Sequence, residues 1–118
     1  MKKERRNYVL YLEDILLAMN RIAEYIEGHS LEGFKKDYKT VDAVIRNFEV
    51  TGEASKNIAI SLKEKYPDVP WQEMYSLRNK ISHEYFGIDY EIIWDLAYNY
   101  LPENKKQISE IIENLKDS

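Results

Sequence analysis

A chain of 118 residues is enough for one domain, covering residues 1–118, with a single hydrophobic core. The sequence has no cysteine, which excludes disulfides and thiolate metal sites, and no apolar run of membrane-spanning length, so we expect a cytoplasmic protein. The net charge of −4 argues against a protein that coats nucleic acid, because such binding depends on clustered Lys and Arg, but it leaves room for a small local basic site.

The first predicted element is a long amphipathic helix over residues 5–27. Its apolar residues recur at spacings of three and four, which places them on one face. Gly28 is a natural helix stop, and Ser30 is placed to cap a short helix over residues 31–36. The start of the chain therefore predicts a long helix, a turn and a short helix.

A second long helix is predicted to open at Asp37 or Thr40, since either side chain can accept a hydrogen bond from the first turn. Gly52 interrupts its apolar stripe, and the missing side chain there would let another backbone come close. We expect this helix to run as far as Tyr66, because the proline that follows pushes Tyr66 out of the helical region.

The last part of the chain predicts two further helical regions. Pro70 fits the first turn of a third helix, because its missing N–H is no loss there. The expected apolar stripe of this helix is Trp71, Met74, Leu77, Ile81 and Tyr85. Gly87 is the expected terminator, Asp89 caps the last helical region, and Pro102 must kink or restart that region. No stretch alternates apolar and polar residues as a strand does, so the predicted fold is all-α, a bundle of four or five helices.

The segment 78–85 carries the most reactive chemistry, because it contains Arg78, Asn79, His83 and Tyr85. The guanidinium of an arginine binds phosphate through a planar fork of donors and stays charged at any working pH. A histidine can accept or donate a proton near neutral pH. Charge stabilisation and proton transfer are two requirements of a phosphodiester-cleaving enzyme that works without a metal.

The spacing of this segment raises a geometric problem. Arg78 and His83 are five residues apart, so an unbroken helix separates their side chains by roughly 140° around its axis. Two arrangements would solve it: the helix breaks before His83, or a two-fold dimer brings two copies of the segment together. Asn79 lies four residues before His83 on the same helical face, where its amide could orient the imidazole.

Each of these residues also has an ordinary interpretation. Arg78 alone would be a surface or ion-pairing arginine, His83 a half-buried histidine, and Tyr85 one of ten tyrosines used for packing. The spacing alone is a weak motif, because many helical proteins contain an Arg and a His at this distance.

Metal chemistry has little support in the sequence. His29 and His83 lie far apart and form no familiar ligand spacing. Asp42, Glu49 and Glu53 fall on one face of the second long helix, where a solvated or partner-facing acidic stripe is favoured over a carboxylate site. No metal or other cofactor is therefore expected.

With these residues in view, the chain resembles the HepT-like toxins, minimal members of the HEPN superfamily. The matching core is Arg-x4-His-x-Tyr, here Arg78, His83 and Tyr85. The similarity extends over nearly the whole chain and includes residues 11–15, 42–49, 52–54 and 66–71, Trp94, and Leu101-Pro102. Val50-Thr51 departs from it, because the family has a more apolar pair there.

The resemblance implies a homodimeric helical bundle of HEPN type with a cleft at the dimer interface. It implies a metal-independent ribonuclease, acting on RNA as the toxin of a two-gene toxin–antitoxin system. The implied protein partner is an MntA-type minimal nucleotidyltransferase, an antitoxin that silences the toxin by transferring AMP to the motif tyrosine, here Tyr85.

If the chain is such a ribonuclease, Arg78 binds the scissile phosphate and His83 acts as general base or acid, with the other protomer's histidine in the complementary role. Asn79 has a supporting role, and Tyr85 receives the inactivating modification. The alternative is a non-catalytic helical module that tethers a nucleotidyltransferase or binds nucleotides, which the net charge of −4 favours.

Overall fold

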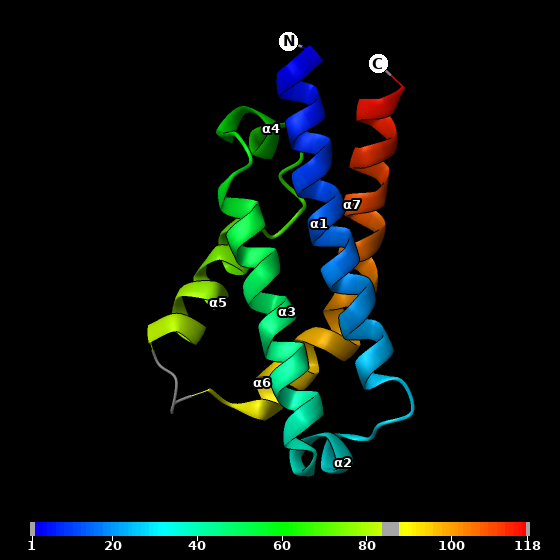
Figure 1. The fold of residues 1–118 in the computed structure, drawn as a ribbon, viewed down its shortest axis with the longest axis vertical. Coiled ribbons are helices and arrows are strands. Elements are labelled where there is room, and N and C mark those ends of the chain that lie inside the picture. Colours follow the sequence, from blue (N-terminus) through cyan, green and yellow to red (C-terminus); the bar gives the residue numbers. More distant parts are fainter. Residues whose placement is uncertain (1, 84–87, 118) are drawn as a thin grey trace.

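The computed structural model describes residues 2–83 and 88–117, with the backbone alone described for residues 2–6. This part of the chain is all-α, as the sequence predicts, and no strand occurs in it (Figure 1). Four longer helices form the bundle: α1 (Lys2–Ile26), α3 (Tyr38–Lys56), α5 (Trp71–His83) and α7 (Leu101–Lys116). Shorter elements connect them: α2 (Leu31–Lys36), α4 (Ile60–Lys65), α6 (Tyr90–Asp95) and the π-helical turn η2 (Leu96–Tyr100).

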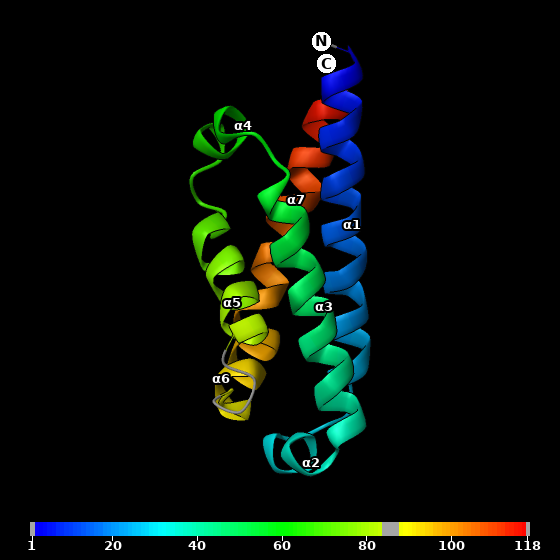
Figure 2. The same ribbon diagram turned by 60° about the vertical axis from the view of Figure 1, so that its left-hand side comes forward.

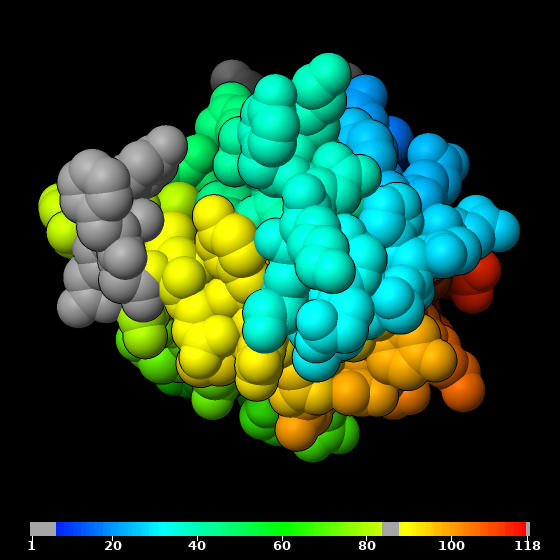
Figure 3. Space-filling model, turned by 90° about the horizontal axis from the view of Figure 1, so that it is seen from below, coloured from blue at the N-terminus to red at the C-terminus, as the bar shows by residue number. Residues whose placement is uncertain are grey.

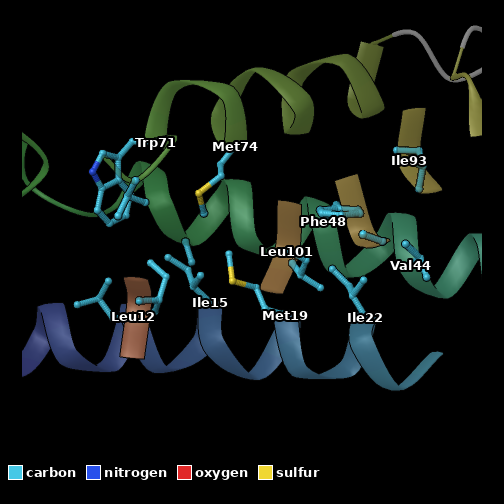
Figure 4. Packing of buried hydrophobic residues seen from close by; sticks show 14 of the residues in the cluster. Leu12, Ile15, Met19, Ile22, Val44, Phe48, Trp71, Met74, Ile93 and Leu101 are labelled. Atoms are coloured by element: carbon cyan, nitrogen blue, oxygen red, sulfur yellow. The ribbon is translucent and has the colours of Figure 1, made fainter. Parts of the chain in front are cut away.

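The central helix of the bundle is α3, which packs against α1 on one side and α5 on the other. The predicted apolar stripe of α1 faces α3, and the side chain of Met74 reaches toward α3 from α5 (Figure 4). On its other flank α1 packs along α7, so the two ends of the chain lie close together (Figure 1). Burial of this apolar surface is the main source of the fold's stability. The fully buried residues of the core include Leu12, Ile15, Ile22, Phe34, Val41, Val44 and Ile108.

The turn between α1 and α3 has the capping geometry that the sequence predicts. Gly28 ends α1 with a φ of +79°, a conformation that residues with a side chain rarely adopt. Ser30 Oγ accepts a hydrogen bond from Gly33 N at 3.1 Å and caps α2.

Asp37 caps α3, because its side chain accepts a hydrogen bond from Thr40 N. Its Oδ2 atom also accepts a hydrogen bond from Thr40 Oγ1 at 2.7 Å and lies 3.3 Å from His29 Nε2. The hydrogen bonds from Thr40, with a smaller contribution from His29, lower the pKa of the Asp37 carboxyl group. In Figure 3 this cyan segment spreads across one end of the bundle beside α6, in yellow.

The expectation of one helix from Asp37 to Tyr66 is wrong. The helix α3 ends at Lys56, and α4 begins at Ile60 after a short turn. Asn57 occupies the break, and asparagine competes with helix formation because its amide bonds locally to the backbone; here Asn57 Nδ2 donates to Glu53 O. Ile58 and Leu62 are both buried nonetheless, so a turned chain satisfies the apolar pattern as well as a straight helix would.

The kink expected at Pro102 is confirmed, and it takes the form of a π-helical turn. Residues Leu96–Tyr100 form η2, and α7 restarts at Leu101 with Pro102 in its first turn. A proline inside an α-helix lacks an N–H donor, and its ring meets the carbonyl four residues earlier. A wider turn before Pro102 relieves both problems, and it lets Leu101 remain buried.

The helices α3 and α5 come close together at Gly52, as the sequence suggests for this glycine. A Cβ atom built on Gly52 would lie 2.3 Å from Arg78 Cβ and 2.7 Å from the carbonyl oxygen of Met74. Ser55, one turn along α3, is fully buried, and its hydroxyl donates to Gly52 O at 2.8 Å. In Figure 2, α5 lies alongside α3. The position of α5, and with it that of Arg78, therefore depends on a glycine at residue 52.

Candidate active site

Helix α5 carries Arg78, Asn79 and His83, and it is helical from Trp71 to its last residue, His83. The possibility that the helix breaks before His83 is therefore wrong. The last turn holds because Ile81, only 6% exposed, anchors it to the core. Arg78 and His83 are thus separated by roughly 140° around one continuous helix. Arg78 is half-buried while His83 is exposed, so one chain does not bring the two side chains together.

Arg78 is held against α3 by a carboxylate. Its Nε atom lies 2.9 Å from Glu53 Oε2, and its side chain is 29% exposed. The N–H of Nε is not directed at the carboxylate, so the contact is an ion pair without a well-formed hydrogen bond. On the other side, Arg78 Nη1 donates to Asn79 Oδ1 at 3.2 Å. The guanidinium therefore has a defined position between Glu53 and Asn79.

The partner of Asn79 differs from the one expected. Its side-chain oxygen accepts from Arg78, its sequence neighbour, whereas the sequence suggested an interaction with His83. Asn79 is thus placed to orient the arginine. Tyr85, the last residue of the motif, and Gly87, the expected terminator of the helix, lie outside the described residues.

The acidic stripe on α3 has partners within the chain. Glu53 pairs with Arg78, and Glu49 lies 3.0 Å from Arg46 and 3.5 Å from the hydroxyl of Ser82 on α5. The sequence predicts this stripe, but as a solvated or partner-facing one. The spacing of four residues between Glu49 and Glu53 shows that they share a face, but it does not show that α5 packs across that face.

Two shallow hollows flank these ion pairs. One, of about 330 Å³, lies between α1 and α3 and is lined by Tyr11 and Asp14 from α1, Glu53 from α3 and Arg78 from α5, among others. The second, of about 720 Å³, is lined by residues of α3, the end of α5 and Tyr90. Arg46 and Glu49 line both, so the two hollows adjoin along α3.

Within residues 2–83 and 88–117, no group of three or more His, Asp or Glu side chains gathers as a metal site would require. In the same part of the chain, no helix is both long enough and apolar enough to cross a membrane. Thr51, where the sequence departs from the family pattern, is 2% exposed, and its hydroxyl donates to Phe48 O at 2.7 Å. A buried hydroxyl with a hydrogen-bond partner is tolerated in a core, so this departure leaves the packing of α3 intact.

Comparison with known proteins shows which family the chain resembles. The chain is 47% identical over 106 residues to "Putative RNase MJ0127" of Methanocaldococcus jannaschii, an alignment that covers 90% of this chain and 88% of the relative. It is 42% identical to "Putative RNase TTE0752" of Caldanaerobacter subterraneus subsp. tengcongensis, covering 90% of this chain and 95% of that protein. It is 39% identical to "Probable ribonuclease HepT" of Thermococcus cleftensis, covering 91% and 97%.

No solved structure matches the chain significantly. The family model described as "Ribonuclease HepT-like" matches residues 15–111, which include the whole of α3 and α5 together with Arg78 and His83. The protein belongs to the HepT-like ribonuclease family, and its all-α bundle is of HEPN type.

Proposed function

We propose that this protein is a metal-independent endoribonuclease whose active site is completed by a second copy of the chain. The main support for the shared site is that α5 is continuous from Trp71 to His83, and the support for the activity is that the chain belongs to the ribonuclease HepT-like family. Because α5 keeps Arg78 and His83 apart, a phosphate bound to Arg78 needs an imidazole from elsewhere. A two-fold dimer in which the two α5 helices meet provides it and gives the shared groove two arginines and two histidines.

The surface beside Arg78 is suited to such contact. Leu10 and Leu17 are 54% and 50% exposed on α1, and they are seven residues apart, so they share one face of that helix. Asp14 lies between them in sequence and lines the same hollow as Arg78. A dimer formed over this face would bury both leucines, and apolar burial is the usual driving force for association.

Arg78 and His83 have complementary roles in the proposed reaction. One imidazole takes the proton from a ribose 2′-hydroxyl, whose oxygen then attacks the adjacent phosphorus. The P–O5′ bond breaks, the second imidazole protonates the leaving 5′-oxygen, and the products are a 2′,3′-cyclic phosphate and a 5′-hydroxyl. Arg78 stabilises the negative charge that builds up on the phosphoryl oxygens. Asn79 helps to hold the guanidinium in place.

The test is cleavage of an RNA oligonucleotide by purified protein in excess chelator, with identification of the product ends. We expect cyclic phosphate ends, and a loss of at least about 100-fold in the Arg78→Ala and His83→Ala proteins. Lys80→Ala, an exposed position on the same helix, is the control. Mixing the two inactive variants should restore part of the activity, because a mixed dimer can join the intact arginine of one subunit to the intact histidine of the other. Full activity in either single variant would refute these roles, and full activity of a protein that stays monomeric at the assay concentration would refute the shared site.

We also propose that the chain is the toxin of a toxin–antitoxin pair and that an MntA-type nucleotidyltransferase transfers AMP from ATP to the Tyr85 hydroxyl. The resemblance of residues 78–85 to the family motif supports this step. A tethered phosphate near Arg78 would occupy the position that substrate needs. Intact mass spectrometry of protein made with and without the partner should show added AMP, and Tyr85→Phe should abolish the addition. Unchanged mass in the presence of an active partner would refute the proposal.

A non-catalytic binding module remains the second candidate, because the hollow at Arg78 contains more carboxylates than cations. Asp14, Glu49 and Glu53 line it together with Arg46 and Arg78. The chelator experiment separates the two functions: a wild-type protein that binds nucleotides but leaves RNA uncut would support the module.

A further inference from the structure

A hollow of about 500 Å³ is lined by the end of α3, by α4 and by the start of α5. It lies at the opposite end of α5 from His83. Lys56 comes from the last turn of α3 and Lys63 from α4. Trp71, Glu73 and Tyr75 come from the first turns of α5. None of these residues has a role in the reaction proposed above.

The charge of this hollow is the opposite of that beside Arg78. Lys56 and Lys63 line it against one carboxylate, that of Glu73. The hollow at Arg78 has three carboxylates against two arginines, and the adjoining one has Asp42 and Glu49 against Arg46. Among the described residues no ion pair engages either lysine. Two unpaired cations facing one hollow are a favourable place for a phosphate, since lysine binds phosphate as a mobile point charge.

The same hollow has an aromatic wall. The indole N–H of Trp71 donates to Tyr66 O at 3.0 Å, and Trp71 is 7% exposed, so this ring serves packing. Tyr75 is half-buried on the wall and lines the hollow. Proteins that hold single-stranded nucleic acid combine cations for the backbone with aromatic rings on which bases stack. Lys56, Lys63 and Tyr75 provide both kinds of contact within one hollow.

The hollow is close to the proposed site of cleavage along both helices. Tyr75 precedes Arg78 by three residues on α5, and Lys56 follows Glu53 by three residues on α3. Three residues are a rise of roughly 4.5 Å, a little less than one turn. Glu53 contacts Arg78, and the end of α3 lies beside the start of α5, so the two helices run in opposite directions. The step from Glu53 forward to Lys56 and the step from Arg78 back to Tyr75 therefore lead from the ion pair toward the same hollow. A strand bound at Arg78 would therefore reach the hollow with a neighbouring nucleotide.

We propose that this hollow is a subsite for a nucleotide next to the scissile phosphate, in which Lys56 and Lys63 bind the neighbouring phosphate and Tyr75 stacks on a base. The assignment rests on the proposed ribonuclease function and adds to it a reason why an acidic chain can hold RNA. The subsite lies one turn away from the carboxylates that surround Arg78, and it accepts any base because stacking is tolerant of sequence.

The test measures binding of a single-stranded RNA oligonucleotide by fluorescence anisotropy over a range of salt concentrations. All proteins carry His83→Ala, so that binding is separated from cleavage. Lys56→Gln/Lys63→Gln should weaken binding by about tenfold or more and reduce the slope of log affinity against log salt by about 0.7 for each phosphate that is no longer neutralised. Tyr75→Leu should weaken binding by about tenfold with little change in slope. The matched control is Lys36→Gln/Lys39→Gln, which removes two exposed lysines at the end of α2 and the start of α3, far from the hollow.

Cleavage kinetics with an otherwise wild-type chain provide a second readout. The ratio of kcat/KM for a long oligonucleotide to that for a dinucleoside monophosphate should fall about tenfold in Lys56→Gln/Lys63→Gln, because the dinucleoside monophosphate has no phosphate besides the scissile one for these lysines to bind. An unchanged affinity and salt slope in this double variant, or an equal loss in the control, would overturn the subsite. A wild-type chain that cuts no RNA would instead overturn the ribonuclease proposal, and the binding measurements would still decide on the subsite.

Discussion

Replacing Gly52 by alanine should damage both stability and activity, because this glycine sets the distance between α3 and α5. The added Cβ would lie 2.3 Å from Arg78 Cβ and 2.7 Å from Met74 O, whereas ordinary contact begins near 3.4 Å. Neither atom can rotate away, since one is backbone and the other is fixed to it. Relief requires α5 to move outward by about 1 Å, and overpacking of this kind costs about 1–3 kcal/mol. Alanine's better helix propensity offsets up to about 1 kcal/mol of that loss.

The net loss of stability should be about 1–2 kcal/mol, which for a domain of this size lowers Tm by roughly 4–8 °C. Thermal unfolding followed by circular dichroism measures it. A shift of Arg78 by about 1 Å should reduce kcat/KM on RNA by roughly 100-fold. Gly33→Ala is the matched control, because its nearest neighbour, Ser30 Oγ, would lie at an acceptable 3.4 Å. If Gly52→Ala were as stable as the wild type, the close approach would not limit the packing. If it lost stability but retained full activity, the position of Arg78 would not be critical.

Three other predictions concern an ion pair, a helix cap and the core. Glu53→Gln should change the free energy of unfolding by no more than about 1 kcal/mol, because the pair with Arg78 is partly solvated. The same variant should lower kcat/KM more than a remote surface change does, and unchanged kinetics would show that the contact does not position the arginine. Hydrogen bonds from Thr40 are the chief cause of the lowered pKa of Asp37. The ionised carboxylate therefore stabilises the fold at pH values above the unfolded-state pKa of about 3.9. This contribution to stability is lost as the pH falls through the lower pKa of the native state. Asp37→Ala should therefore flatten the acid dependence of Tm below about pH 4, and a wild-type-like acid profile would contradict this assignment. Phe34→Ala should cost about 3–5 kcal/mol in chemical denaturation, since the ring is fully buried, and a cost below about 1 kcal/mol would mean that the site collapses without strain.

Local chemistry explains which structural predictions succeeded. The caps at Ser30 and Asp37 were predictable because a side chain there bonds to the first turn of its own helix. Pro102 was recognisable as a disturbance because its missing donor acts within one turn, although the sequence did not indicate a π-helical form. The end of α3 at Lys56 was missed because both a straight helix and a turned chain bury Ile58, and the apolar pattern does not distinguish them.

The sequence by itself determined the all-α class, the family resemblance and the choice of candidate site residues. These properties depend on residue type and on spacing along one helix, which are visible in a linear chain. Only the tertiary structure decided that Arg78 faces Glu53, that Asn79 bonds to this arginine, and that Lys56, Lys63 and Tyr75 share a hollow. The ion pair and the hollow depend on the distance between α3 and α5, which in turn depends on the small residue at position 52 of α3, whereas the bond between Asn79 and Arg78 depends on the side-chain conformations of two neighbouring residues on α5.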